Sequence, residues 1–93
     1  MLKLKIEMFG LPSNATTLKD VTVELNDGAS ITDLIAALKK TIPSLEGLVI
    51  RDGTDRLTES YTFNINGHFY IGYEHLKLKP ADSVKLLLVA SGG

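Results

Sequence analysis

The sequence contains no cysteine, and it lacks an excess of charge of either sign. Without cysteine, the chain has no disulfide framework, no thiolate nucleophile and no sulfur ligands for a metal. Lys and Arg total 10 and Asp and Glu total 11, which gives a net charge of −1 and a pI near 6.1. Proteins that bind nucleic acid through its phosphates usually carry a basic face, so the charge balance disfavours that class.

Long apolar runs are also missing. No stretch approaches the roughly 20 apolar residues needed to span a bilayer. The first ten residues, MLKLKIEMFG, alternate charged and apolar side chains and so lack the apolar core of a signal peptide. These features favour a cytoplasmic protein. A length of 93 residues, with 44% hydrophobic and 23% charged residues, predicts one globular domain with a modest core.

The first third of the sequence contains two alternating segments. In residues 2–8, every second side chain is apolar, and the same alternation returns in residues 20–25. A period of two predicts strands with one buried face. Residues 10–19 are rich in Gly, Pro, Ser, Asn and Thr, which predicts a loop. The two strands are therefore expected to form a hairpin with a long connection.

The pattern then changes to that of a helix. Ser30 is a good N-cap, and Asp33 lies in the first turn, where a negative charge is favourable. Lys39 and Lys40 fall in the last turn, and Pro43 ends the helix. The apolar positions of one helical face are Ile31, Leu34, Ile35, Leu38 and Ile42.

The second half is less regular. Residues 48–50 are either a short strand or part of an irregular excursion. Residues 61–65 alternate again, and Asn66-Gly67 is a strong hairpin signal, followed by an apolar run at 69–71. Residues 79–82, KPAD, predict a turn.

The last predicted strand is SVKLLLVA, residues 83–90. Its alternation predicts that Val84, Leu86 and Leu88 are buried. Leu87 and Val89 are out of phase with these positions and should point to the solvated face of the sheet.

The sequence offers little that could form a catalytic centre. His68 and His75 are its only histidines, and without cysteine or a carboxylate at fixed spacing they make a poor zinc site. We interpret both as rim residues of the hairpin. No pair of acidic residues has a spacing that would bring two carboxylates together, and no nucleotide-binding or nucleophile-elbow motif is present. The sequence predicts a protein with no catalytic centre, metal or cofactor of its own.

The order of elements is strand, strand, helix, possible short strand, strand, short strand, strand. One helix can cover only one face of a sheet, so the fold class is α+β, with a mixed sheet of four to five strands. This order resembles the β-grasp, the ubiquitin-like architecture, in which the first and last strands lie parallel at the centre of the sheet. Such a fold does not by itself define a function.

The C-terminal part carries a more specific resemblance. The stretch FNING, the later run LKLKPADSVKLLLVASGG and the ending Ser91-Gly92-Gly93 are similar to the pattern of the MoaD/ThiS family of ubiquitin-like sulfur carriers. The resemblance implies a β-grasp domain over residues 1–90 and a flexible tail over residues 91–93. MoaD-type members often have a pair of prolines before the glycines. Residues 88–90 are Leu-Val-Ala here, which leaves the pathway open.

The same resemblance implies the chemistry. The Gly93 carboxylate is converted to an acyl-adenylate by an activating enzyme of the MoeB/ThiF type, which uses ATP and Mg²⁺. A sulfur donor then replaces AMP, and the resulting thiocarboxylate serves an acceptor synthase of the MoaE or ThiG type in molybdopterin or thiamin synthesis. The chain can thus act as the small subunit of a synthase such as molybdopterin synthase. Glycine suits this role because Gly93 has no Cβ to crowd the carboxyl carbon and Gly92 adopts backbone angles closed to other residues.

Exposed apolar side chains beside the tail suit a partner-binding surface. We predict that Phe9, Leu87 and Val89 form it, together with Ala90 and Ser91. The alternative is that the loop of residues 10–19 covers these side chains. The pair Phe69-Tyr70 fits either the core side or the partner side.

Two other functions remain open on the sequence alone. A ubiquitin-like modifier, joined to lysines through Gly93, shares the fold, the tail and the adenylation step. A plain β-grasp interaction domain with an incidental Gly-Gly ending needs neither the tail nor the adenylation step.

Overall fold

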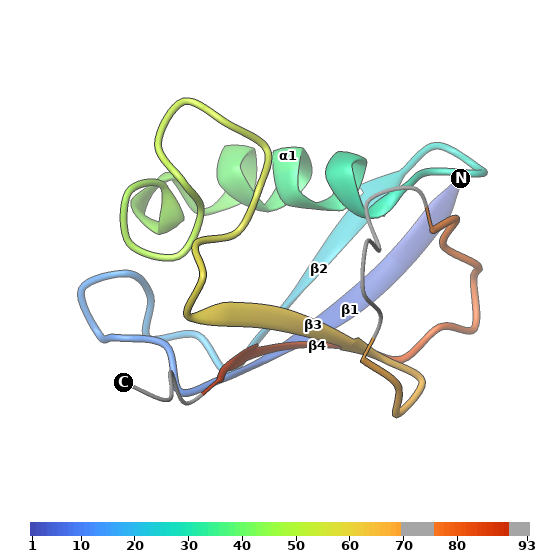
Figure 1. Cartoon of the computed structure of the whole chain (residues 1–93). Helices are drawn as coiled ribbons and strands as arrows, with labels where there is room; N and C mark the ends of the chain where they lie inside the picture. The colour runs from blue at the N-terminus through green and yellow to red at the C-terminus, as the bar shows by residue number, and fades with distance from the viewer. Residues whose placement is uncertain (70–75, 90–93) are drawn as a thin grey trace.

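Over residues 1–69 and 76–89, the chain forms a four-stranded mixed sheet with one α-helix across one face (Figure 1). The structure is a computed structural model, and it describes residues 1–69 and 76–89. Its elements are β1 (Leu2–Phe9), β2 (Asp20–Leu25), α1 (Ile31–Thr41), the short 3-10 helix η1 (Pro43–Leu45), β3 (Tyr61–Ile65) and β4 (Val84–Leu88). The strand order is β2-β1-β4-β3.

The two central strands, β1 and β4, run parallel, and each pairs with its outer neighbour in the antiparallel sense. The resemblance to the β-grasp predicted this central parallel pair. A parallel pair needs a long crossover between its strands, and here the whole middle of the chain provides it. As a result, β4 ends at the same edge of the sheet as β1.

The core lies between α1 and the facing side of the sheet. The first strand is buried at every second residue, which confirms the predicted period of two. Ser30 caps α1 by accepting a hydrogen bond from the Asp33 backbone N–H, and the Asp33 carboxylate accepts one from the Ser30 N–H in return. The largest side chains with no exposed surface include Phe63 and Leu86. Within the described residues, no helix is both long and apolar enough to cross a bilayer.

Residues 46–60 form an irregular excursion, so the short strand considered for residues 48–50 is absent. Ile50 makes only isolated bridges, to Glu46 and Leu57, yet Val49 and Ile50 are fully buried. Their apolar run therefore fills the core without joining the sheet. Lys39 of α1 binds the excursion, because its Nζ donates a hydrogen bond to the Thr54 carbonyl at 2.9 Å.

The Asn66-Gly67 turn is present as predicted. Both residues have positive φ, 55° and 84°, and Ile65 and His68 exchange two backbone hydrogen bonds across the turn, as in a two-residue hairpin. The Asn66 side chain also donates to the Asp82 carboxylate and accepts from the Ser83 N–H, both at 2.8 Å. It thereby joins this turn to the predicted turn at residues 79–82.

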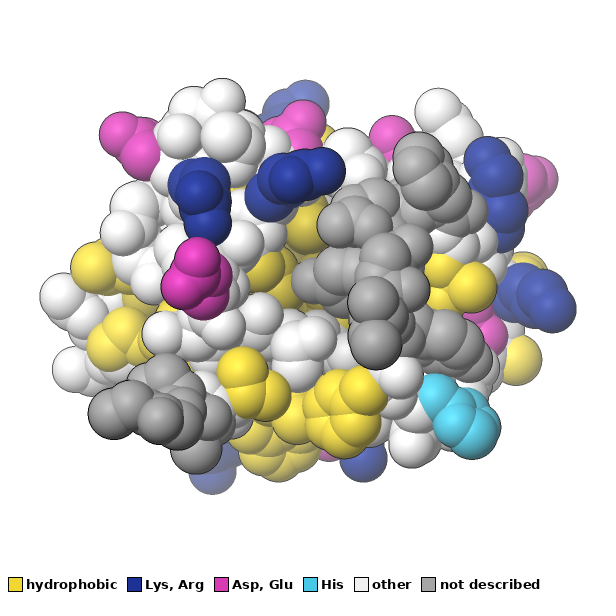
Figure 2. Space-filling model, in the orientation of Figure 1, with side chains coloured by type: hydrophobic (Ala, Val, Ile, Leu, Met, Phe, Trp, Pro, Cys, Tyr) yellow, Lys and Arg dark blue, Asp and Glu magenta, His cyan; other side chains and the backbone are white. Residues whose placement is uncertain are grey.

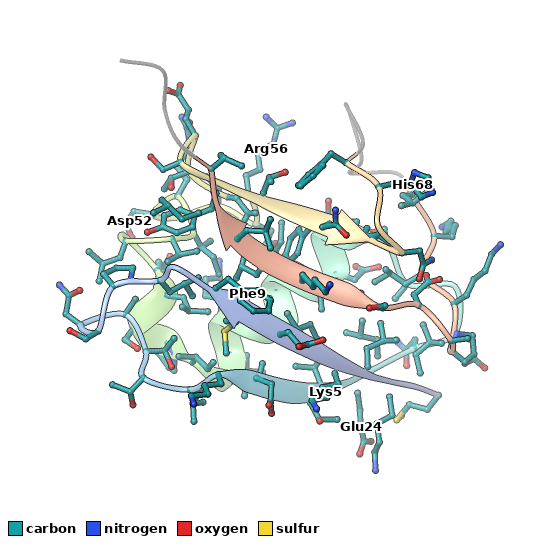
Figure 3. The ribbon with its side chains drawn as sticks, turned by 90° about the horizontal axis from the view of Figure 1, so that it is seen from below. Lys5, Phe9, Glu24, Asp52, Arg56 and His68 are labelled. Atoms are coloured by element: carbon teal, nitrogen blue, oxygen red, sulfur yellow. The ribbon has the colours of Figure 1, made fainter. Side chains whose placement is uncertain are left out.

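Part of the region after this turn lies outside the described residues. This applies to Tyr70, Ile71 and His75. Phe69 is 60% exposed, and His68 is exposed at the edge of the sheet (Figure 3).

One prediction for β4 is wrong. Val84 and Leu86 are buried as expected, but Leu88 is 50% exposed. Leu88 is the last residue of the strand and pairs with Tyr61, the first residue of β3. Gly10, in the loop after β1, lies against Leu88 and has no side chain to cover it. The alternation places Leu88 on the core side, but the core does not extend that far.

Candidate functional site

The candidate site is the end of β4 that leads to the C-terminus. The last described residue, Val89, donates its backbone N–H to the Ser60 carbonyl at 2.8 Å. This bond extends the β3–β4 pairing by one residue, so Val89 is fixed to the chain at the start of β3. The predicted site residues Ala90, Ser91, Gly92 and Gly93 lie outside the described residues.

Phe9 and Leu87 are neighbours beside this base. They are paired in the parallel register of β1 and β4, and Phe9 is 48% exposed. Figure 3 views the sheet from below and shows Phe9 on the face opposite α1. Leu87 and Val89 are half-buried. The loop of residues 10–19 therefore does not cover Phe9. That these residues bind a partner stays a prediction.

The sheet face has two chemically different parts. Toward the start of β1 it carries charged side chains, among them Lys3, Lys5 and Glu24, and Lys5 lies 3.9 Å from the Asp20 carboxylate. Toward the end of β1 it becomes apolar. Figure 2 shows hydrophobic side chains gathered along the lower edge of the molecule. The apolar part thus lies at the end of β4, from which the chain continues to residues 90–93.

Two features of the site escaped the sequence analysis. The exposed Leu88 adds apolar surface at the base of the tail, and Gly10 lies against it. A Cβ atom added at Gly10 would lie 3.0 Å from the Leu88 Cβ, and Gly10 has a φ of +75°. A glycine directly after a strand is a signal for such a position, but the sequence does not show which residue it touches.

Replacing Gly10 by alanine tests this contact. Gly10→Ala should lower the free energy of unfolding by about 2–3 kcal/mol, because the positive φ costs about 1 kcal/mol and crowding against Leu88 adds about 1–2 kcal/mol. Gly28→Ala is the matched control, since Gly28 has a φ of +79° with open space around it. Urea denaturation of both variants measures the difference. Equal losses would show that Leu88 yields without cost.

The described residues contain no group of three or more His, Asp or Glu side chains that could hold a metal ion. The site is therefore a partly apolar surface that includes Phe9 and Leu88. It lies at the end of β4, where a backbone hydrogen bond holds Val89 to Ser60.

Comparisons with known proteins identify the family and the fold. The sequence profile of the ThiS family matches residues 6–93. No curated protein is significantly similar to the chain in sequence. Among solved structures, the chain is similar to small archaeal modifier protein 1 of Haloferax volcanii, with a TM-score of 0.80 and 21% identity over 97% of this chain and 100% of that one.

Two further structures show the same likeness. Small archaeal modifier protein 1 of Methanosarcina acetivorans has a TM-score of 0.74 and 24% identity, over 100% of this chain and 98% of that one. A protein of Pyrococcus furiosus, described as putative molybdopterin converting factor subunit 1, has a TM-score of 0.75 and 21% identity, over 97% and 100%. At these identities the structures establish the β-grasp fold. The profile covers nearly the whole chain, and the chain therefore belongs to the ThiS family.

Proposed function

We propose that the protein is a sulfur carrier, in which residues 91–93 act as a flexible tail and the carboxylate of Gly93 is the working group. The observation that carries the proposal is the anchoring of Val89 to Ser60 at the end of a central strand, in a chain of the ThiS family. Four extended residues beyond Val89 reach at most about 14 Å. That length lets the carboxylate enter a partner's active site while the folded body stays outside.

The chemistry needs activation because a carboxylate is a poor electrophile. In the proposed first step, a carboxylate oxygen of Gly93 attacks the α-phosphorus of ATP. Pyrophosphate leaves, and the product is an acyl-adenylate. In the second step, a sulfur nucleophile attacks the acyl carbon and AMP leaves. With hydrosulfide as the simplest donor, the products are the thiocarboxylate, AMP and one proton. The activating enzyme supplies the site for ATP and Mg²⁺, and this chain supplies the reacting group and the docking surface.

We propose Phe9 as a docking residue for that enzyme. Phe9→Ser removes an exposed ring without opening the core, so it should raise the KM for the carrier about tenfold and leave kcat within about twofold. Lys3→Ser is the matched control, because Lys3 is exposed on the same strand and the same face. ATP–pyrophosphate exchange with the cognate activating enzyme measures both parameters. An unchanged KM for Phe9→Ser would remove Phe9 from the docking surface.

A protein modifier is the second candidate, supported by the likeness to two small archaeal modifier proteins. It shares the activation step, so the two functions differ in where the acyl group goes. Capture of the affinity-tagged protein from its own cells separates them. Conjugates with isopeptide bonds to lysine identify a modifier, whereas a free C-terminal thiocarboxylate identifies a carrier. We propose an acceptor of the molybdopterin or thiamin type for the carrier.

A further inference from the structure

A cavity of about 390 Å³ lies on the α1 side of the molecule, between the helix, the excursion and the start of β3. Ile35, Leu57 and Tyr61 provide its apolar surface, and Arg51 and Arg56 line it as well. Figure 2 shows basic side chains next to apolar atoms in the upper half of the view. Small-molecule sites commonly have this size and combine apolar walls with a few polar groups.

The two arginines are held opposite each other. Arg51 donates its backbone N–H to the Arg56 carbonyl at 2.8 Å, and Thr54 closes the turn between them by donating to the Arg51 carbonyl. Within residues 1–69 and 76–89, neither guanidinium makes a hydrogen bond or an ion pair. The fold thus places two arginines at one cavity, neither of them in an ion pair with another described residue.

The acidic side chains nearby do not cancel these charges. Asp55 also lines the cavity, but its carboxylate lies 3.0 Å from the Lys39 Nζ. The hydrogen bond to Asp55 raises the pKa of the Lys39 ammonium above its ordinary value. Glu46 accepts a hydrogen bond from the Gly53 N–H. Asp52 lies at a different part of the surface from Arg56 (Figure 3).

We propose that this cavity binds a small aromatic phosphate monoester, with the ring against Ile35, Leu57 and Tyr61 and the phosphate on Arg51 and Arg56. Guanidinium groups bind phosphate oxygens in a bidentate manner, and two of them match a dianion. This site is separate from the Phe9 surface and from the tail, so it stands whether or not the proposed carrier function holds.

Titration of the full-length protein with phenyl phosphate, followed by NMR of the backbone amides, tests the site. The expected result is saturable shifts at Arg51, Leu57 and Tyr61 with a Kd of about 1 mM, as befits a small ligand. Inorganic phosphate lacks the ring and benzyl alcohol lacks the charge, so each should bind at least about tenfold more weakly. Arg51→Gln and Arg56→Gln should each weaken phenyl phosphate binding about tenfold. Lys85→Gln, on the other face of the sheet, is the control.

Both arginines are exposed, so the variants should fold. Unchanged amide signals away from the substituted residue will show that they do. Three results would overturn the proposal. The first is the absence of saturable shifts up to about 10 mM phenyl phosphate, ten times the expected Kd. The second is equal binding of phenyl phosphate and either partial probe, and the third is equal binding by the arginine variants and Lys85→Gln. Tyr61 pairs with Leu88 in the sheet, so the same spectra also show whether binding is sensed at the base of the tail.

Discussion

Removing Gly92 and Gly93 is expected to abolish activation by the adenylating enzyme while leaving the free energy of unfolding unchanged. The core and the last described anchor, the bond from Val89 to Ser60, do not depend on these two residues. The reacting carboxylate would then belong to Ser91, two residues too near the folded body. Misplacement of a reacting group by even about 1 Å can cost a hundredfold in rate, so the loss should be at least that large.

ATP–pyrophosphate exchange measures the activation, and urea denaturation measures the stability. Gly92→Ala keeps the length of the tail and its terminal carboxylate, so it serves as the control for length and should retain part of the activity. Exchange within about threefold of the full chain after deletion would favour the plain interaction domain, which needs no Gly-Gly ending.

The second large effect is on stability. Leu86→Ala should lower the free energy of unfolding by about 2–5 kcal/mol, because Leu86 is fully buried and its truncation leaves a cavity in a close-packed core. Leu88→Ala makes the same chemical change two residues later on the same side of the strand. Since Leu88 is 50% exposed, its loss should be below about 1 kcal/mol.

Urea denaturation monitored by circular dichroism gives both values under the same conditions. Similar losses for the two variants would mean that the core extends to the end of β4, as the sequence pattern predicted and the structure contradicts. A small loss for Leu86→Ala would contradict the central position of β4.

Local sequence signals were enough to predict most of the fold. The alternation of β1, the Ser30 cap with Asp33 and the Asn66-Gly67 turn each depend on residues only a few positions apart. The parallel pairing of β1 and β4 is a long-range feature, and it was predicted only through the resemblance to the β-grasp. Leu88 was misplaced because alternation gives the side of the sheet but not the extent of the layer that covers it.

Of the predicted site residues, the structure describes Phe9, Leu87 and Val89. Phe9 directly follows the buried Met8, so its exposure fits the alternation of the strand. The close approach of Gly10 to Leu88 joins two segments far apart in the sequence, so no local pattern contained it. The cavity at Arg51 and Arg56 also escaped prediction, because it depends on how the irregular excursion packs against α1 and Tyr61.

Intact-mass spectrometry of the reconstituted reaction tests the central claim most directly. The full chain is incubated with ATP, Mg²⁺, its cognate activating enzyme and a sulfur donor, and the chain lacking Gly92 and Gly93 is the control. The proposed function predicts a gain of about 16 mass units, from one oxygen replaced by sulfur at Gly93, in the full chain alone. An unchanged mass, with an activating enzyme shown to form the adenylate, would contradict the claim that this protein carries sulfur.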